Sequence, residues 1–211
     1  GEVLERIHPK IVYICNPNNP TGTALDPAEI GRWAAAHGRT LFLVDEAYLS
    51  FTPGLRSAVT LELPNILTLR SMTKDYALAG LRLGYAVGLP ALIQPIARVR
   101  PPWNVNALAQ AAGLAALADE AYYRETLAAL QVAVSALRAG LVACGLSPLP
   151  STTHFFLVKV REGAVFRRAL LSCGIQVRDC ASFGLPAYVR IATRRPEENA
   201  RLLAVLQESK L

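Results

Sequence analysis

The sequence has 211 residues, a formal net charge of +6 and a hydrophobic content of 52%, which is enough chain for one or two domains. No uninterrupted apolar run reaches the roughly 18 residues of a membrane span, and no run of about five or six like charges marks a nucleic-acid-binding tail. The cysteines, which match no disulfide or zinc spacing, predict reduced thiols in the cytoplasm; they are Cys15, Cys144, Cys173 and Cys180. We therefore expect a cytoplasmic protein with no membrane partner, no nucleic-acid partner and no metal site.

The first half of the chain alternates short apolar strands with helical sequence. Asp26-Pro27 is typical of a helix N-terminus, and that helix is expected to run to Ala36. Strands are predicted at residues 11–15, 41–44, 66–69 and 83–87. Strand, helix and strand with short connections predict an α/β fold with a mostly parallel sheet and flanking helices.

The second half predicts a different kind of unit. Helical spacing of apolar residues extends over 106–118 and 122–142, and Pro148-Leu149-Pro150 then interrupts the chain. Beyond it, strands are predicted at 155–158, 175–177 and 188–191, and helices at 165–173 and 197–208. We therefore expect a large domain at residues 1–146 and a small C-terminal α+β domain at residues 147–211.

Polar motifs follow three of the predicted strands, where ligands bind in open α/β sheets. They are Asn16-Pro17-Asn18-Asn19-Pro20-Thr21-Gly22, Asp45-Glu46-Ala47-Tyr48 and Ser71-Met72-Thr73-Lys74, with Arg82 eight residues further on. A lysine amine can form a Schiff base, a carboxylate can pair with a protonated ring nitrogen, and an arginine can bind a phosphate. Ser-x-x-Lys also opens β-lactamase sites, but no Ser-Asp-Asn or Lys-Thr-Gly follows here.

Taken together and in this order, the motifs resemble those of the class I/II aminotransferase family, which has the fold called pyridoxal-phosphate (PLP) fold type I. The resemblance implies pyridoxal 5'-phosphate as the cofactor and Lys74 as the catalytic residue that binds it covalently. It further implies that Asp45 pairs with the ring nitrogen and that Tyr48 and Asn19 hydrogen-bond the phenolic oxygen. Ser71, Thr73 and Arg82 would contact the phosphate.

The same resemblance assigns a substrate site and a partner. Arg190, in Tyr188-Val189-Arg190-Ile191-Ala192, is expected to anchor the α-carboxylate of a small amino substrate, with Asn19 beside the substrate. The family pattern begins well before Gly1, so the N-terminal part of the family fold is expected to be missing. Members of the family pair as homodimers, which we expect here.

Segments near the C-terminus favour two related activities. Gly184-Leu185-Pro186 resembles histidinol-phosphate aminotransferases, which act on a small phosphorylated amine in amino-acid biosynthesis. Trp103 and Arg178-Asp179-Cys180 resemble the L-threonine O-3-phosphate decarboxylases of cobalamin biosynthesis. We predict the aminotransferase, with the decarboxylase as the alternative. An aminotransferase-like sensor domain of a transcriptional regulator is a further alternative.

Overall fold

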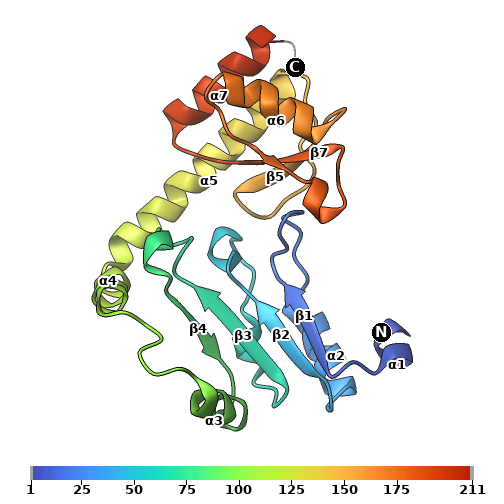
Figure 1. Cartoon of the computed structure of the whole chain (residues 1–211), viewed down its shortest axis with the longest axis vertical. Coiled ribbons are helices and arrows are strands. Elements are labelled where there is room, and N and C mark those ends of the chain that lie inside the picture. The colour runs from blue at the N-terminus through green and yellow to red at the C-terminus, as the bar shows by residue number, and fades with distance from the viewer. Residues whose placement is uncertain (1, 210–211) are drawn as a thin grey trace. The chain divides into compact units, whose positions relative to one another are not determined.

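The computed structural model describes residues 2–209, which form two compact units (Figure 1). The first unit contains the residues up to Asn18 and then Ala24–Tyr123. The second contains the short segment Asn19–Thr23 and the residues from Arg124 onward. Asn19 therefore belongs with the C-terminal part of the chain, although it lies close to the N-terminus in sequence.

The first unit is built on a four-stranded sheet with the order β1-β2-β3-β4. β1, β2 and β3 are parallel, and β4 runs antiparallel to β3. The strands are β1 (Ile11–Cys15), β2 (Leu41–Asp45), β3 (Ile66–Ser71) and β4 (Gly84–Val87). Its helices are α1 (Glu2–Ile7), α2 (Pro27–Ala36), α3 (Pro90–Val99) and α4 (Ala107–Ala118), with short 3-10 turns η1 (Leu49–Phe51), η2 (Ala58–Leu61) and η3 (Ala79–Leu81).

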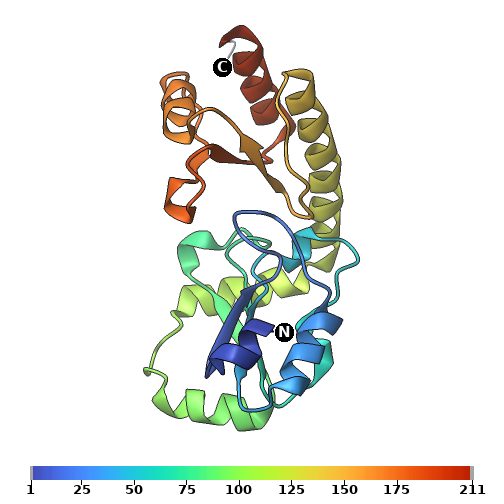
Figure 2. The same cartoon turned by 90° about the vertical axis from the view of Figure 1, so that its right-hand side faces the viewer.

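Helix α2 covers one face of this sheet (Figure 2). Asp26 caps its first turn by accepting a hydrogen bond from the Ala28 amide, and Pro27 occupies the first helical position. Ile30 and Ala34 of the helix are buried against Phe42 and Val44 of β2. Burying the larger of these side chains, Ile30, Phe42 and Val44, contributes roughly 1.5–3 kcal/mol each, so this contact fixes the helix on the sheet.

Buried Asn65 fixes the end of α2 to the strand that follows it. Its side-chain amide donates to the backbone carbonyls of Ala34, His37 and Thr40. These carbonyls lie at the C-terminus of α2 and in the turn to β2, where the last carbonyls of a helix lack the amide partners of its interior. The backbone amides of His37 and Thr40 also donate to the carbonyls of Ala34 and His37. One side chain thus closes the connection and sets where β2 begins.

The second unit is a three-stranded antiparallel sheet with the order β5-β7-β6. Its core contains Leu137 and Leu141 from α5, Phe156 from β5 and Ile191 from β7, together with side chains of α6 and α7. Successive strand residues face opposite sides of a sheet, so Arg190 faces away from this core. The elements are α5 (Glu120–Ala143), β5 (Phe155–Lys159), α6 (Gly163–Ser172), β6 (Arg178–Asp179), η4 (Ala181–Phe183), β7 (Tyr188–Ala192) and α7 (Pro196–Ser209).

Two expectations from the sequence differ from this structure. The strand predicted at 175–177 is displaced, because the pairing with β7 is made by Arg178 and Asp179, while Val177 packs in the core. The domain boundary predicted between residues 146 and 147 also differs from the division by contacts. The second unit begins at Arg124, within α5, because this helix packs Leu137 and Leu141 into the C-terminal core.

Helix α5 contains no uninterrupted apolar run of about 18 residues, as expected from the sequence, but it is long and apolar overall. It is the one helix among residues 2–209 with the length and composition of a span, with a mean hydropathy of 1.6 over 18 residues. Core helices of globular proteins share that composition. Leu137 and Leu141 have protein partners in the second unit, so packing accounts for this part of its apolar surface.

Candidate active site

The parallel pairing of β1, β2 and β3 brings their carboxyl ends to one edge of the sheet. Cys15, the last residue of β1, pairs with Asp45, the last residue of β2, and Asp45 pairs with Leu69 of β3. Ser71 ends β3 two residues later. Asp45 and the Ser71–Lys74 loop therefore start from the same edge, as the strand-end positions of the motifs predicted.

Asp45 is half-buried and held by two donors. The Ala47 amide donates to Oδ1 at 3.0 Å, and the Tyr13 hydroxyl donates to Oδ2 at 2.5 Å. Partial burial, reinforced by the hydrogen bond to Asp45 and by its negative charge, raises the pKa of Tyr13, so the phenol keeps its proton. An ionised carboxylate can accept about four hydrogen bonds, so Asp45 retains sites for a ligand.

The residue after Asp45 ties the loop to the next strand. Glu46 is only 2% exposed, and its carboxylate accepts from the Ser57 hydroxyl and the Ala58 amide, each at 2.6 Å. Arg70 of β3 lies 3.3 Å from the same carboxylate. Tyr48 follows in this loop, with its ring 6.3 Å from that of Phe51. Buried Glu46 was not singled out from the sequence, because an acidic residue next to Asp45 looks like part of the same polar motif.

The loop after β3 presents two hydroxyls and an amine. Ser71 Oγ and Thr73 Oγ1 lie 2.7 Å apart, and the Thr73 amide donates to Ser71 Oγ at 3.2 Å. Lys74 is exposed, and no hydrogen bond or ion pair involves its amine within residues 2–209. The loop can therefore offer hydroxyl donors and a nucleophilic nitrogen to a ligand.

Asp75 anchors this loop from the side next to Lys74. Its Oδ2 accepts from the Ser50 hydroxyl at 2.7 Å and from the Tyr123 hydroxyl at 3.3 Å. Tyr76 stacks on Tyr123 with ring centroids 4.7 Å apart. Burial, together with the charge of Asp75, raises the pKa of Tyr123 to about 12, so it stays a donor. This anchor was missed in the sequence because its members lie 25 and 48 residues from Asp75.

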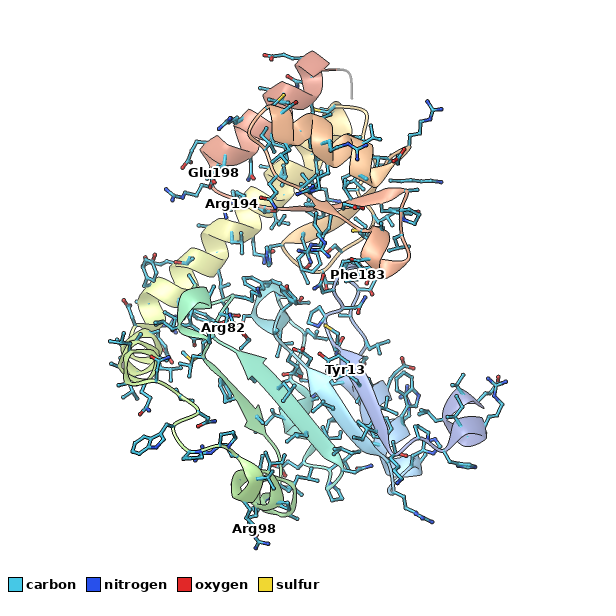
Figure 3. All side chains as sticks on the ribbon, viewed as in Figure 1. Tyr13, Arg82, Arg98, Phe183, Arg194 and Glu198 are labelled. Carbon is cyan, nitrogen blue, oxygen red and sulfur yellow. The ribbon has the colours of Figure 1, made fainter. Side chains whose placement is uncertain are left out.

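Arg82 stands at the turn between β3 and β4 (Figure 3). Its backbone is left-handed, with φ +59°, a conformation that costs a non-glycine residue roughly 1–2 kcal/mol. Its guanidinium donates to the Ala79 carbonyl at 2.8 Å, and within the described part of the chain no carboxylate pairs with it. Gly84 follows, where a Cβ would lie 2.9 Å from the Arg70 carbonyl oxygen. The close approach of β4 to β3 thus needs this glycine.

In the second unit, Arg190 lies against the Asn19 segment. Its Nη1 donates to Asn19 Oδ1, and its guanidinium lies 5.0 Å from the centre of the Phe155 ring. Its Nε is buried and has no hydrogen-bond partner among the described residues. A buried guanidinium nitrogen without a partner is costly. The buried Nε of Arg190 therefore indicates that an anionic ligand binds here.

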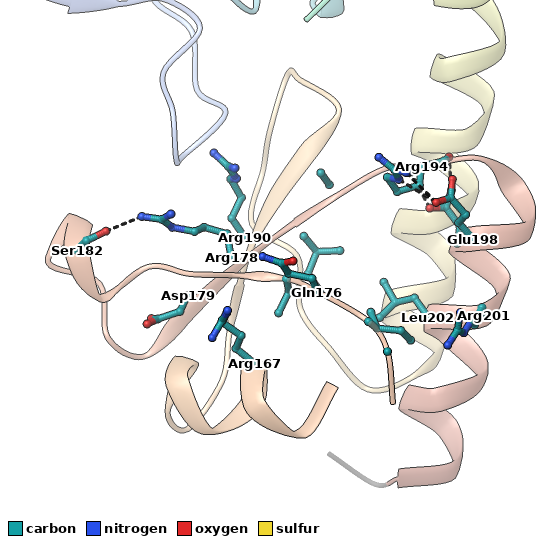
Figure 4. Close-up of a pocket in the computed structure, with 16 residues that line it drawn as sticks. Arg167, Gln176, Arg178, Asp179, Ser182, Arg190, Arg194, Glu198, Arg201 and Leu202 are labelled. Atoms are coloured by element: carbon teal, nitrogen blue, oxygen red, sulfur yellow. Dashed lines mark hydrogen bonds and ion pairs between the residues drawn. The ribbon is translucent and has the colours of Figure 1, made fainter. Parts of the chain in front are cut away.

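A cavity of about 900 Å³ opens beside Arg190 on the sheet of the second unit (Figure 4). Arg178 of β6 is the direct register partner of Arg190, so both arginines lie on the same face. Arg178 donates to the Ser182 hydroxyl at 2.9 Å and lies over the Phe183 ring. Arginines dominate the charged residues of the lining, which include Arg167, Arg178, Arg190, Arg194 and Arg201 with the acids Asp179 and Glu198. This concave, positively charged surface suits a small anion.

Comparison with known proteins decides the family. The family model for aminotransferase class I and II matches residues 2–206. The chain belongs to this family. The prediction of the family and of its fold is thereby confirmed.

The class I and II relatives are longer than this chain. It is 40% identical over 204 residues to histidinol-phosphate aminotransferase 1 of Nitrosococcus oceani, which covers 94% of this chain and 55% of that protein. A structure of histidinol-phosphate aminotransferase from Sinorhizobium meliloti in complex with pyridoxal-5'-phosphate aligns with a TM-score of 0.87 at 30% identity. That alignment covers 98% of this chain and 59% of that one. The chain thus spans little more than half the length of the curated relatives it matches.

A second activity occurs among the solved relatives. L-Threonine-O-3-phosphate decarboxylase from Porphyromonas gingivalis aligns with a TM-score of 0.86 at 31% identity. The alignment covers 95% of this chain and 64% of that one. Both activities considered from the sequence are therefore represented among proteins of the same fold.

The predicted site residues of this class I and II chain fall into two groups. Those in the first unit are Asp45, Tyr48, Ser71, Thr73, Lys74 and Arg82. Asn19 and Arg190 form the other group, in the second unit, where they are hydrogen-bonded to each other. The structure adds Tyr13 and Asp75, which no motif pointed to, and it places Arg178 of the Arg178-Asp179-Cys180 segment beside Arg190.

We expect Glu46→Gln to lower the free energy of unfolding by about 1–3 kcal/mol, because the Ser57 hydroxyl, the buried Ala58 amide and Arg70 lose the carboxylate charge. The loss of free energy of unfolding is measured by urea denaturation, monitored by circular dichroism. Glu29→Gln is the matched control, because Glu29 pairs with Arg32 in solvent and such pairs contribute about 1 kcal/mol at most. Equal losses in the two variants would contradict the anchoring role of Glu46.

Proposed function

We propose that this chain is the part of a pyridoxal-phosphate-dependent enzyme that holds the cofactor, and that the enzyme is an aminotransferase acting on a small phosphorylated amine or amino acid. One observation carries the proposal. Lys74, whose amine has no partner among the described residues, lies on the loop after β3, and Asp45 ends the adjacent strand. The similarity to histidinol-phosphate aminotransferases supports the substrate class.

The residues of the first unit fit the cofactor in chemistry and in free bonding capacity. Ser71 and Thr73 hold two hydroxyls 2.7 Å apart, and Arg82 has a guanidinium without an acidic partner in residues 2–209. Two hydroxyls and an arginine are suitable donors for a phosphate. Asp45 supplies the carboxylate that a pyridinium nitrogen needs, and Lys74 supplies the amine. When bound, pyridoxal phosphate withdraws electrons from the substrate's Cα.

Each residue then has a distinct role. Lys74 attaches the cofactor and afterwards moves a proton at the substrate's Cα, which requires an amine that is not already paired. Asp45 keeps the ring nitrogen protonated by its negative charge. Tyr48 and Asn19 are proposed to donate hydrogen bonds to the phenolic oxygen of the cofactor.

Arg190 is proposed to bind a carboxylate of the substrate. Its buried Nε lacks a partner among the described residues, and a carboxylate can accept from two guanidinium nitrogens at once. Arg178, directly across from it on β6, provides a second cationic group on the same face. Two neighbouring arginines favour a substrate with two anionic groups, such as a phosphate and a carboxylate.

L-Threonine O-3-phosphate decarboxylation is the second candidate. It is favoured by the similarity to the Porphyromonas gingivalis decarboxylase and by the pair of arginines, because threonine phosphate carries both a phosphate and a carboxylate. Cobalamin biosynthesis would then be the pathway. A sensor domain of a regulator stays an untested prediction.

We also propose a homodimer, on the evidence of helix α4. Its sequence, ALAQAAGLAALA, is apolar except for Gln110, and helices that are apolar almost all round are buried in folded proteins. Leu108 and Leu114 are 73% and 72% exposed, whereas Ala109 and Gly113 on another side are buried. A second copy of the protein is proposed to cover the exposed side.

The cytoplasmic location likewise remains a proposal, supported by bacterial relatives with biosynthetic names.

If Lys74 binds the cofactor, the complete protein should take up pyridoxal phosphate with a visible absorbance band, and borohydride should fix the cofactor to the peptide that contains Lys74. Lys74→Ala should lose both the band and the fixed adduct. Lys159→Ala, which removes an exposed lysine of β5, serves as the control and should retain both. A fixed adduct at full occupancy in Lys74→Ala would exclude this assignment.

The reaction is tested with two separate incubations of the complete protein. Histidinol phosphate with 2-oxoglutarate should yield glutamate, measured by amino-acid analysis. Threonine phosphate alone should release no carbon dioxide. The opposite pair of results would establish the decarboxylase instead, and a protein that binds the cofactor but gives neither product would contradict both assignments.

The dimer is tested with Leu114→Glu. A charge on the exposed side of α4 should convert the protein to a monomer in light scattering, because an unpaired buried charge is costly at an interface. Leu171→Glu, at an exposed leucine of α6, is the control and should leave the mass unchanged. A dimer that persists in the first variant would place the interface elsewhere.

A further inference from the structure

Tyr13 and Asp45 are joined across two neighbouring strands at the edge where the candidate cofactor site lies. In the register of β1 and β2, Tyr13 pairs with Leu43, two residues before Asp45. Residues two apart in a strand face the same side of the sheet, so the phenol and the carboxylate share one face. The hydroxyl of Tyr13 donates to Asp45 Oδ2 at 2.5 Å (Tyr13 is labelled in Figure 3).

This hydrogen bond is charge-assisted, because its acceptor is a carboxylate oxygen. Asp45 Oδ1 already accepts from the Ala47 amide, so donors approach the carboxylate from its own loop and from β1. O–H donors to a carboxylate make short hydrogen bonds that are about twice as strong as neutral ones. Partial burial and the hydrogen bond to Asp45 raise the pKa of the phenol, which keeps it a donor at neutral pH.

The side chain of Tyr13 has no evident structural role that would account for this contact. It is 57% exposed and lies on an edge strand of the four-stranded sheet. The core of the first unit takes Val12 and Ile14 from this strand, on the opposite face. The specific interaction that Tyr13 makes is therefore the one with Asp45.

We propose that Tyr13 is a positioning residue for Asp45: its hydroxyl fixes one carboxylate oxygen, so that the negative charge of Asp45 is held beside the place of the cofactor's ring nitrogen and keeps a proton on the ring. The inference rests on the proposed function. An opposite charge held close to a group favours the charged form of that group. Without the phenol, the carboxylate could turn away from the ring nitrogen, and the ring would lose positive charge.

Tyr13→Phe tests the proposal, because it removes only the hydroxyl. In the complete protein loaded with cofactor labelled with ¹⁵N at the ring nitrogen, the NMR signal of the variant should move from the protonated toward the neutral position. The pH midpoint of the cofactor's visible absorbance should rise by about half a unit or more. A positive ring disfavours a second positive charge on the attached Lys74 nitrogen, so a ring with less positive charge raises the pKa of that nitrogen. Asp45→Asn provides the reference for a neutral ring.

Tyr85→Phe is the matched control, since Tyr85 is an exposed tyrosine of β4, and it should change neither signal. Tyr13→Leu also removes the hydroxyl and repeats the test if the phenylalanine variant does not fold. Unchanged signals in a Tyr13 variant that binds cofactor at Lys74 would overturn this inference alone. Tighter cofactor binding in Tyr13→Phe would also overturn it, by showing that the phenol occupies the place of the ring nitrogen. A wild-type protein that binds no cofactor would instead refute the proposed function.

Discussion

The in-register pairing of β1, β2 and β3 is the constraint on which the first unit depends. Because the three strands are parallel and end together, one edge of the sheet collects Asp45 and the loop that begins at Ser71. A shift of β2 by one residue would turn Asp45 toward α2 and carry Phe42 and Val44 out of the core. The same packing that holds α2 on the sheet therefore also orients the Asp45 carboxylate toward the opposite face.

Buried polar contacts then hold the loops that leave this edge. Glu46, bonded to Ser57, Ala58 and Arg70, fixes the chain after Asp45. Asp75, bonded to Ser50 and Tyr123, fixes the chain after Lys74. These acids satisfy their own bonding capacity inside the protein, whereas the Lys74 amine has no such partner in the described residues. The contrast separates residues that build the loops from those available to a ligand.

The second unit carries a different kind of chemistry. Its helices cover one face of the antiparallel sheet, and the other face presents Arg190 and Arg178 side by side. The segment Asn19–Thr23 is held in this unit by the contact of Asn19 with Arg190 and by the bonds of Thr152 to the Gly22 carbonyl. Gly22 adopts a left-handed backbone, and a side chain there would collide with Ser151. A glycine at this position is thus a requirement of the fold.

Most of the secondary structure and the family could be predicted from the sequence alone. Short apolar runs, the Asp26-Pro27 cap and the proline and glycine breaks predicted most strands and helices, because hydrophobic period and capping are local properties. The order of Asn19, Asp45, Lys74 and Arg82 indicated the family. The short strand β6, the start of the second unit within α5, and the contacts of Tyr13, Asp75 and Arg178 came only from the tertiary structure. These depend on which strand pairs with which and in what register, and such contacts join residues far apart in the chain that leave no local pattern in it.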